Sequence, residues 1–185
     1  MLRKAIAITA FLMLVTALHD ELSANRIEEA TSEHKTIQTP LMNAEGKTIG
    51  KAVIMQAANG VLIHLEASGL PHGWHALHVH QYGVCEAPSF DSAGGHFNPT
   101  KREHGYDNPK GYHAGDLPNV YADKNGSVRV EFFTDQLTLV KSRPNSLLKE
   151  GGTALIIHEG ADDYQTDPAG GAGKRLACGV ISQDA

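Results

Sequence analysis

Most of the chain from Thr36 onward consists of short runs in which apolar and polar residues alternate, separated by turn sequences. From Val61 to Leu65, the odd-numbered residues are apolar and share one face of an extended strand, while Leu62 and His64 share the other. The chain has no sustained helical periodicity and no internal repeat of roughly 20–50 residues. The pattern therefore predicts an all-β fold.

Turn signals divide this region into about eight strands, a spacing typical of an antiparallel sandwich or barrel. The Asn59–Gly60 dipeptide predicts one hairpin, and Asp123–Gly126 predicts a second between the strands on either side of it. The predicted strands are Thr36–Met42, Thr48–Ala57, Val61–Leu65, Gly73–Tyr82, Val120–Ala122, Ser127–Thr134, Ala154–His158 and Leu176–Ile181.

Residues 83–118 break the alternation. They are rich in glycine and proline, with scattered histidine and aspartate. A structureless stretch of this length is unusual inside a compact domain. We expect metal ligands and a disulfide to order it, and we expect a second glycine-rich loop at residues 159–174.

The N-terminal region predicts export. A short basic region precedes the almost wholly apolar stretch Ala5–Leu18, and small residues follow it, as in a signal peptide. A retained membrane anchor is the alternative, although about 14 apolar residues fall short of the roughly 20 that span a bilayer. The expected organisation is a signal peptide at residues 1–24, a polar, flexible leader at 25–35 and one domain at 36–185.

Composition limits the partners. The chain is 41% hydrophobic and 20% charged, as in soluble globular proteins, and its net charge is −5 with no basic run. Nucleic acid is therefore excluded as a partner. We expect a periplasmic or secreted protein with no membrane association after signal removal, and both a homodimer and a monomer remain open.

Cys85 and Cys178 are the only cysteines of the chain. In an exported protein, an isolated pair more often forms a disulfide than remains as two buried thiols, which is the alternative. The bridge would close a long loop, and the chain-entropy model gives such a closure roughly 4–5 kcal/mol.

Seven of the eleven histidines lie between His72 and His113. His78 and His80 are two residues apart on a predicted strand, so their imidazoles share one face and can bind one ion, although such pairs are more often structural. His158 ends an apolar strand and, taken alone, fits a core position. With His78 and His80 it completes a set of imidazoles suited to copper or zinc.

The glycine-rich region carries a second set, because His104, His113 and Asp116 follow His96 at spacings of 8, 9 and 3 residues. Three imidazoles and one carboxylate suit a tetrahedral zinc site that is closed to water and structural. The binding energy of the ion would then order the loop.

Together these motifs resemble the copper/zinc superoxide dismutases, over about Thr36 to Ile181. The spacings that follow His96 match the zinc loop of that family. Cys85, five residues after His80, matches its bacterial periplasmic branch. The segments that carry the resemblance are His78–His80 (HVH), Gly94–Pro99 (GGHFNP), His104–Gly105 (HG), His113–Asn119 (HAGDLPN) and Gly173–Val180 (GKRLACGV).

The resemblance implies an eight-stranded antiparallel Greek-key sandwich or barrel, immunoglobulin-like, with long metal-binding and electrostatic loops. It also implies one copper ion and one zinc ion per subunit, with His96 bridging them as an imidazolate, a form that two adjacent cations favour. Copper is expected on His78, His80, His96 and His158, and zinc on His96, His104, His113 and Asp116.

Other roles follow from the same resemblance. Arg175 corresponds to the arginine that guides the anionic substrate, superoxide, although an isolated arginine is more often a solvated surface residue. With His96, it is the expected catalytic pair. The remaining implied roles are an intrasubunit disulfide (Cys85 with Cys178), a carboxylate that links His78 to His104 (Asp162) and a structural histidine near copper (His75).

The implied function is conversion of two superoxide anions and two protons to oxygen and hydrogen peroxide, by alternate reduction and reoxidation of copper, which protects the cell envelope. The alternative is a non-catalytic copper/zinc-binding or copper-handling domain of the same fold. Such a domain would be expected to lack a copper ligand or Arg175, and the chain has the full set. A zinc hydrolase would need an open coordination position, and the zinc set is already complete.

Overall fold

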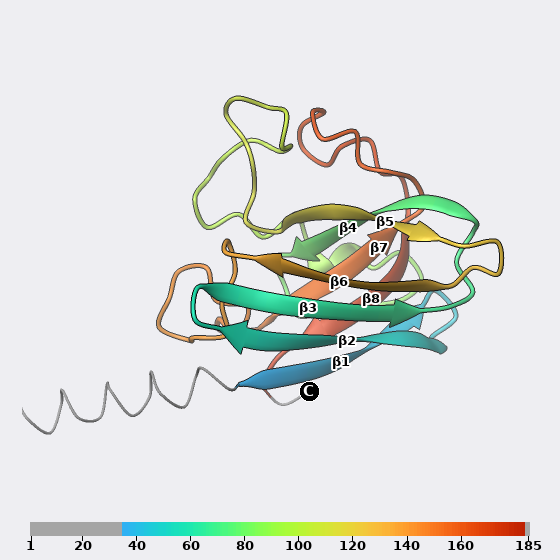
Figure 1. The fold of residues 1–185 in the computed structure, drawn as a ribbon, viewed down its shortest axis with the longest axis horizontal. Helices are drawn as coiled ribbons and strands as arrows, with labels where there is room; N and C mark the ends of the chain where they lie inside the picture. Colours follow the sequence, from blue (N-terminus) through green and yellow to red (C-terminus); the bar gives the residue numbers. More distant parts are fainter. Residues whose placement is uncertain (1–34, 184–185) are drawn as a thin grey trace, which may run out of the picture. The chain divides into compact units, whose positions relative to one another are not determined.

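The computed structural model describes residues 35–183, which form eight strands and one short 3-10 helix (Figure 1). The predicted signal peptide at 1–24 and residues 25–34 of the predicted leader lie outside the described residues. Between residues 35 and 183, no helix is long and apolar enough to cross a membrane. The elements are β1 (Thr36–Asn43), β2 (Thr48–Ala57), β3 (Gly60–Ala67), β4 (Gly73–His80), η1 (Asp91–Ala93), β5 (Asp116–Ala122), β6 (Val128–Thr134), β7 (Thr153–His158) and β8 (Arg175–Ile181).

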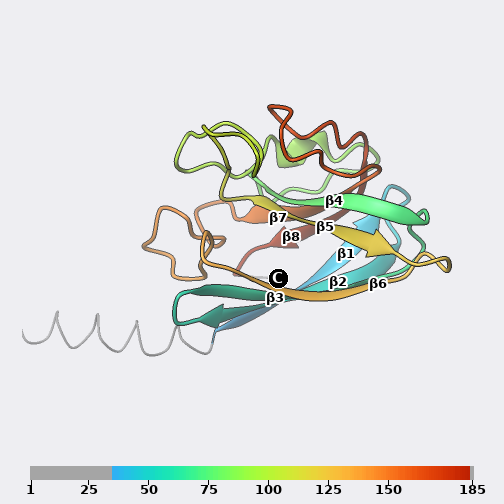
Figure 2. The same cartoon turned by 45° about the horizontal axis from the view of Figure 1, so that its top comes forward.

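The strands pair in the order β5-β4-β7-β8-β1-β2-β3-β6, and every pairing is antiparallel. Figure 2 shows the first four strands of this order as one layer and the last four as a second layer. The alternation predicted in β3 is observed, because Val61, Ile63 and Leu65 are fully buried in the core between the layers. The predicted all-β class of eight antiparallel strands is confirmed.

The second predicted hairpin is wrong. The Asp123 carboxylate accepts the N–H groups of Asn125 and Ser127 at 2.8 and 2.9 Å, so the turn itself forms. However, β5 pairs with β4 and β6 pairs with β3, which puts the two strands at opposite ends of the order. The turn is a corner between the layers. A turn sequence specifies a change of direction, whereas the ladder that each strand joins depends on partners elsewhere in the chain.

The structure extends β5 by four residues beyond the prediction, to Asp116. Asp, Pro and Asn are depleted in strands, so Asp116 to Asn119 resembles a loop in the sequence. A proline is tolerated here because β5 is an end strand, whose outer edge needs no ladder hydrogen bonds. The ladder with β4 is also irregular between His75 and Leu77.

The 135–152 loop closes the end of the barrel opposite the 123–126 turn (Figure 1). Its leucines are buried in the core, and Gln56 of β2 accepts hydrogen bonds from the Thr138 hydroxyl at 2.9 Å and from the Leu139 N–H at 2.5 Å. Asn145 donates to the Gln136 carbonyl at 2.9 Å. The loop is therefore fixed by the core and by side-chain amides. Its buried leucines are Leu137, Leu139, Leu147 and Leu148.

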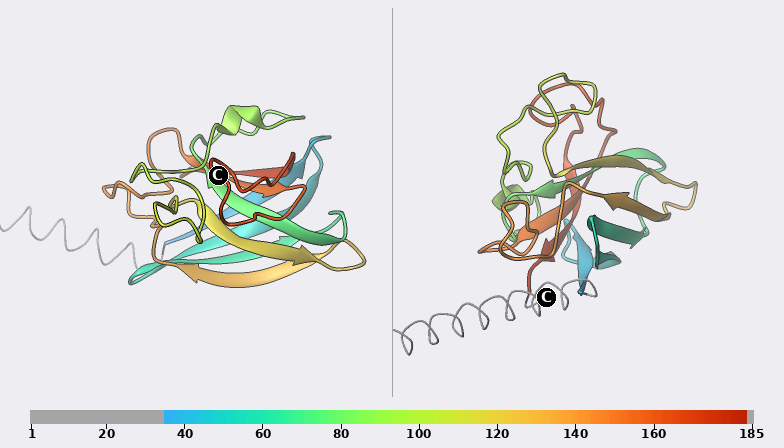
Figure 3. Two further views of the ribbon diagram at one scale, coloured as in Figure 1. Left: turned by 90° about the horizontal axis from the view of Figure 1, so that it is seen from above. Right: turned by 60° about the vertical axis from the view of Figure 1, so that its left-hand side comes forward.

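The 81–115 and 159–174 loops lie side by side over the β5-β4-β7-β8 layer, the first in green and yellow-green and the second in orange-red (Figures 1 and 3). The predicted disulfide is confirmed: Cys85 of the first loop is bonded to Cys178 of β8, with a Cα–Cα distance of 5.8 Å. It anchors the start of the 81–115 loop to the barrel. The candidate site lies between these loops and the strands.

Candidate metal centre

Four histidine rings converge on one point from three parts of the chain. His78 and His80 belong to β4, His158 ends β7, and His96 comes from the 81–115 loop. All four are buried, and one ring nitrogen from each lies within 4.8 Å of the others. Residues two apart on a strand point to the same face, and the His78 and His80 rings lie on one face of β4 as predicted, with centroids 6.4 Å apart.

The hydrogen bonds of these rings determine which nitrogen carries the proton. His80 donates from Nδ1 to the Gly94 carbonyl at 2.9 Å, and His158 donates from Nδ1 to the Gly173 carbonyl at 3.3 Å. Each Nε2 then carries a lone pair and no proton, and the two Nε2 atoms face each other at 3.4 Å. Two lone pairs cannot form a hydrogen bond with each other, whereas a cation between them satisfies both.

The second cluster surrounds the carboxylate of Asp116. Asp116 Oδ2 accepts the backbone N–H groups of Gly105 at 3.2 Å and His113 at 3.0 Å. Oδ1 lies 2.8 Å from His96 Nδ1 and 3.2 Å from His113 Nδ1, and His104 Nδ1 lies 3.0 Å from Oδ2. All four side chains are buried, and their ligand atoms lie within 4.8 Å of one another. Three imidazoles and one carboxylate are a usual donor set for zinc.

His96 belongs to both clusters. Its Nδ1 points at Asp116, and its Nε2 is buried without a hydrogen-bond partner. The centroid of its ring lies 4.0 Å from that of His78 and 5.4 Å from that of His113. One ring therefore separates the two groups, with one nitrogen available to each.

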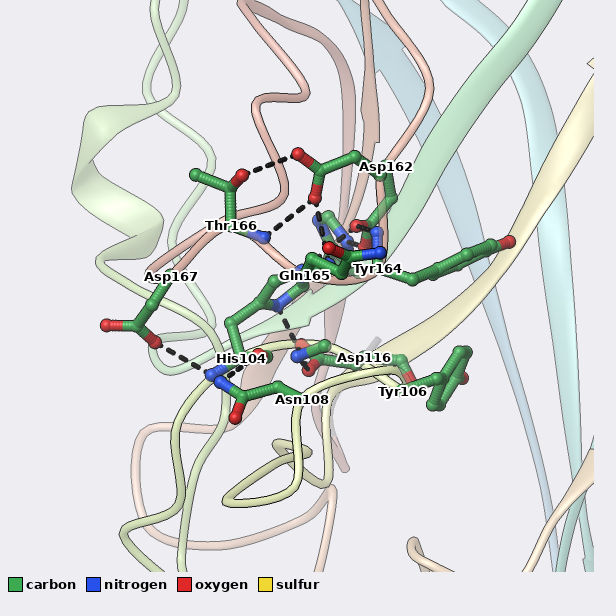
Figure 4. A network of polar contacts seen from close by, with 12 residues as sticks. His104, Tyr106, Asn108, Asp116, Asp162, Tyr164, Gln165, Thr166 and Asp167 are labelled. Atoms are coloured by element: carbon green, nitrogen blue, oxygen red, sulfur yellow. Dashed lines mark hydrogen bonds and ion pairs between the residues drawn. The ribbon is translucent and has the colours of Figure 1, made fainter.

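Asp162 of the 159–174 loop forms a second connection between the clusters, in addition to His96. Its Oδ2 accepts from His78 Nε2 at 2.8 Å, and its Oδ1 accepts from His104 Nε2 at 3.0 Å. Figure 4 shows Asp162 beside His104 and Asp116, with residues of both loops around them. These bonds fix both tautomers and turn Nδ1 of each ring toward its own cluster.

The electrostatics of the clusters differ. Burial lowers the pKa of His80 to about 2, that of His158 to about 3 and that of His96 to about 4, so these rings are neutral at pH 7. Burial acts in the same direction on His104, but the carboxylates of Asp116 and Asp162 beside its ring outweigh it and raise its pKa to about 9. Burial raises the pKa of both carboxyls, and the hydrogen bonds from the histidines more than reverse this and hold the two pKa values well below the usual range.

Three buried ring nitrogens lack a hydrogen-bond partner, namely His78 Nδ1, His96 Nε2 and His104 Nδ1. His104 Nδ1 is close to Asp116 Oδ2 but lacks hydrogen-bond geometry. Buried polar atoms are rarely left unsatisfied in native proteins. A metal ion in each cluster would satisfy all three nitrogens, because the first faces one cluster, the third faces the other and His96 lies between them. The residues present therefore fit one ion in each cluster.

Arg175, the first residue of β8, lies beside the four-histidine cluster. Its guanidinium donates to the carbonyls of Phe90 at 2.6 Å and Gly94 at 2.7 Å. The Gly94 carbonyl also accepts from His80, so one oxygen joins the arginine to the cluster. Burial lowers the pKa of Arg175, but an arginine remains a cation at any physiological pH.

His75 of β4 is buried behind the cluster, with Nδ1 2.8 Å from the His158 carbonyl and Nε2 2.7 Å from the Pro71 carbonyl. It thereby connects the end of β7 to the segment that precedes β4. Its contacts are with backbone atoms, so its place in the structure is that of a support for His158.

The sequence analysis missed several residues that hold the clusters. Gly170 adopts φ +63°, and a Cβ there would overlap the Asp162 carboxylate and lie 2.9 Å from His104 Nε2. Asp167 accepts the His104 N–H at 2.7 Å (Figure 4). Tyr106 donates to the Asp116 carbonyl at 2.7 Å. The glycine-rich composition of the two loops was the only signal for these contacts, and it does not identify individual residues.

Comparisons with known proteins agree on one family. The family model described as copper/zinc superoxide dismutase matches residues 30–181. Two proteins of Aquifex aeolicus, superoxide dismutase [Cu-Zn] 1 and 2, are 50% and 53% identical to the chain, over 88% and 84% of it and 96% and 91% of their own lengths. A crystal structure of a double mutant of a superoxide dismutase-like protein from Bacillus subtilis is 44% identical, with a TM-score of 0.77, over 78% of this chain and 96% of that one.

Proposed function

Because the chain belongs to the copper/zinc superoxide dismutase family, we propose that it converts two superoxide anions and two protons to oxygen and hydrogen peroxide. In this proposal copper is held by the four-histidine cluster and zinc by the cluster around Asp116. The observation that carries it is the position of His96, whose two ring nitrogens face the two clusters.

Bound copper supplies a centre that gains and loses one electron, so that one superoxide is oxidised and the next reduced. The chain orients this centre. His80 and His158 are neutral at the pH of the reaction and present lone pairs, because their other nitrogens donate to backbone carbonyls. His78 turns Nδ1 toward the cluster, because its Nε2 is engaged by Asp162. His96 Nε2 is the atom at which the protein can hold a proton and release it to the peroxide that forms.

Arg175 binds the substrate anion. Its two hydrogen bonds to backbone carbonyls fix the guanidinium beside His80 and leave further N–H donors free. The positive charge attracts superoxide to this side of the cluster in a protein whose net charge is −5. The complete ligand set and this arginine favour the enzyme over the non-catalytic metal-binding domain.

We also propose that the protein acts outside the cytoplasm, in the periplasm or as a secreted protein. The disulfide supports this location, because such bonds persist in oxidising compartments. The apolar stretch Ala5–Leu18 supports export through a signal peptide at residues 1–24.

The test is a superoxide dismutation assay on protein reconstituted with copper and zinc, with His158→Ala as the control. The wild type is expected to turn over superoxide and to hold one copper and one zinc per chain. His158→Ala is expected to keep its zinc and lose turnover by more than the roughly 10–100-fold that changes outside the ligand set cost. Zinc uptake alone, or no turnover by the wild type, would refute the proposal.

Arg175→Ala tests the role of the arginine. Loss of about 1.4 kcal/mol of attraction for the anion slows turnover roughly tenfold. Metal content, measured on the same sample, is expected to stay unchanged, because Arg175 donates only to backbone carbonyls. A wild-type rate would remove Arg175 from substrate binding.

A further inference from the structure

Asn119 of β5 holds the main chain of Asp162 with both ends of its side-chain amide. Its Nδ2 donates to the Asp162 carbonyl at 2.9 Å, and its Oδ1 accepts the Asp162 N–H at 2.8 Å. The pair of bonds fixes the peptide groups on both sides of the Asp162 Cα. It therefore fixes the direction in which the carboxylate leaves the backbone.

An irregularity in the β5 ladder points the Asn119 side chain toward Asp162. His75 of β4 pairs with Val120 and Leu77 pairs with Leu117, so two residues of β5 lie opposite one residue of β4. In a regular strand, Asp116 and Asn119 would point to opposite faces because they are three residues apart. The extra residue brings both side chains to the face covered by the loops.

Tyr164 completes the arrangement. Its hydroxyl accepts the Asn119 N–H at 2.8 Å, and its own N–H donates to Asp162 Oδ1 at 2.7 Å. Asp162 lies in a loop with no strand of its own, and another tie from this part of the loop to the sheet is the bond from the Ala76 N–H to the Gly160 carbonyl, at 2.7 Å. Asn119 is thus the strand side chain that fixes the main chain of Asp162, whereas His78 of β4 contacts its carboxylate.

We propose that Asn119 is a positioning residue for both metal clusters. It sets the place of the Asp162 carboxylate, which in turn orients His78 in one cluster and His104 in the other. This inference rests on the proposed function, since it assumes that the clusters bind copper and zinc. Groups that orient metal ligands typically contribute about 10–100-fold to metal affinity.

The experiment compares Asn119→Ala with Asn145→Ala in the full chain. Asn145 is a matched control: it is also partly buried and donates from Nδ2 to a backbone carbonyl at 2.9 Å, but in the 135–152 loop, which holds no cluster residue. Zinc affinity is measured by competition with a chromophoric chelator, the copper environment by electron paramagnetic resonance, and folding by the melting temperature.

Asn119→Ala is expected to weaken zinc binding about 10–100-fold and to change the copper spectrum. Asn145→Ala is expected to lower the melting temperature while zinc affinity and copper spectrum stay as in the wild type. If Asn119→Ala fails to fold, Tyr164→Phe decides, because it removes only the hydroxyl that accepts the backbone N–H of Asn119. A several-fold weaker zinc affinity is then expected.

Zinc affinity and copper spectrum equal to wild type in Asn119→Ala, or in Tyr164→Phe when only that variant folds, would overturn the inference and leave Asn119 a purely structural residue. That result is distinct from failure of the proposed function. If the proposed function fails, the wild-type protein itself will not bind both metals or will not turn over superoxide.

Discussion

The two metal clusters share a ring but are built in different ways. The four-histidine cluster takes His78, His80 and His158 from the strands β4 and β7, whose backbones are fixed by their ladders. The cluster around Asp116 takes His104 and His113 from a loop without strands. In the first, the sheet positions the ligands before any ion binds. In the second, hydrogen bonds and the ion itself must do so.

The contrast extends to the carboxylates. The four-histidine cluster contains no carboxylate, and burial keeps its His80, His96 and His158 rings neutral. In the other cluster, Asp116 and Asp162 lie on either side of His104. Their two negative charges help to hold this ring, which comes from a loop rather than from a strand. We conclude that the strand-borne cluster is preformed, whereas the loop-borne cluster depends on contacts between two loops.

Metal removal should affect the two clusters unequally, and this is the largest effect we expect. Ions present at about 1,000 times their Kd stabilise the folded state by about 4 kcal/mol. After chelation, amide hydrogen exchange is expected to increase mainly in residues 95–115 and 159–174, with β4 and β7 little changed. An equal increase in the strands and the loops would contradict the contrast.

Cys178→Ser should be the next largest change. Losing the bridge between residues 85 and 178 lowers the free energy of unfolding by roughly 2–4 kcal/mol, the usual loss for a disulfide and below the roughly 4–5 kcal/mol that the chain-entropy model gives for a loop of this length. Urea unfolding of the metal-free protein measures it. Cys85→Ser and the double variant should show the same loss, because all three remove one bond, and additive losses would mean that the thiols act separately.

Gly170→Ala tests the contact between the loops, with Gly171→Ala as its control. Both glycines have φ near +64°, so both substitutions carry a similar backbone cost of about 1–2 kcal/mol. Only at Gly170 would the new Cβ overlap the Asp162 carboxylate, since the nearest atom at Gly171 is 3.9 Å away. Gly170→Ala should therefore weaken zinc binding about 10–100-fold, as measured by chelator competition. Equal zinc affinities in the two variants would show that Asp162 tolerates displacement.

The pH dependence of metal binding should also separate the clusters. His104 has a pKa of about 9 in the metal-free protein and must lose its proton to bind zinc. Apparent zinc affinity should then rise about tenfold per pH unit between pH 7 and 9. Copper binding to zinc-free protein should be nearly constant over that range, because His80 and His158 are already neutral. Binding titrations with each metal at several pH values measure this. Equal changes of zinc and copper affinity with pH would contradict the raised pKa of His104.

The alternation of residues predicted the strands well, because burial on one face imposes it directly. It failed where the partner of a strand is decided elsewhere: the Asp123–Gly126 turn forms, but β5 and β6 join different ladders. It also failed at Asp116 to Asn119, where an edge strand with an irregular ladder tolerates residues that are rare in strands.

For the site, spacing identified the histidines and Asp116 because metal ligands must be of a few residue types in fixed order. The structure brings these residues together in two groups that share His96. The contacts of Asn119, Gly170 and Asp167 could not be predicted in this way. They depend on how two irregular loops lie against each other and on one extra residue in β5, neither of which leaves a periodic signal.

The central claim is that the ring of His96 lies between two different ions. Diffraction data collected on both sides of the copper and zinc absorption edges, from crystals of the metal-loaded protein, test it most directly. The account predicts a copper peak next to His96 Nε2 and a zinc peak next to Nδ1. A single ion, or a ring of His96 that contacts metal through one nitrogen only while both ions are bound, would contradict it.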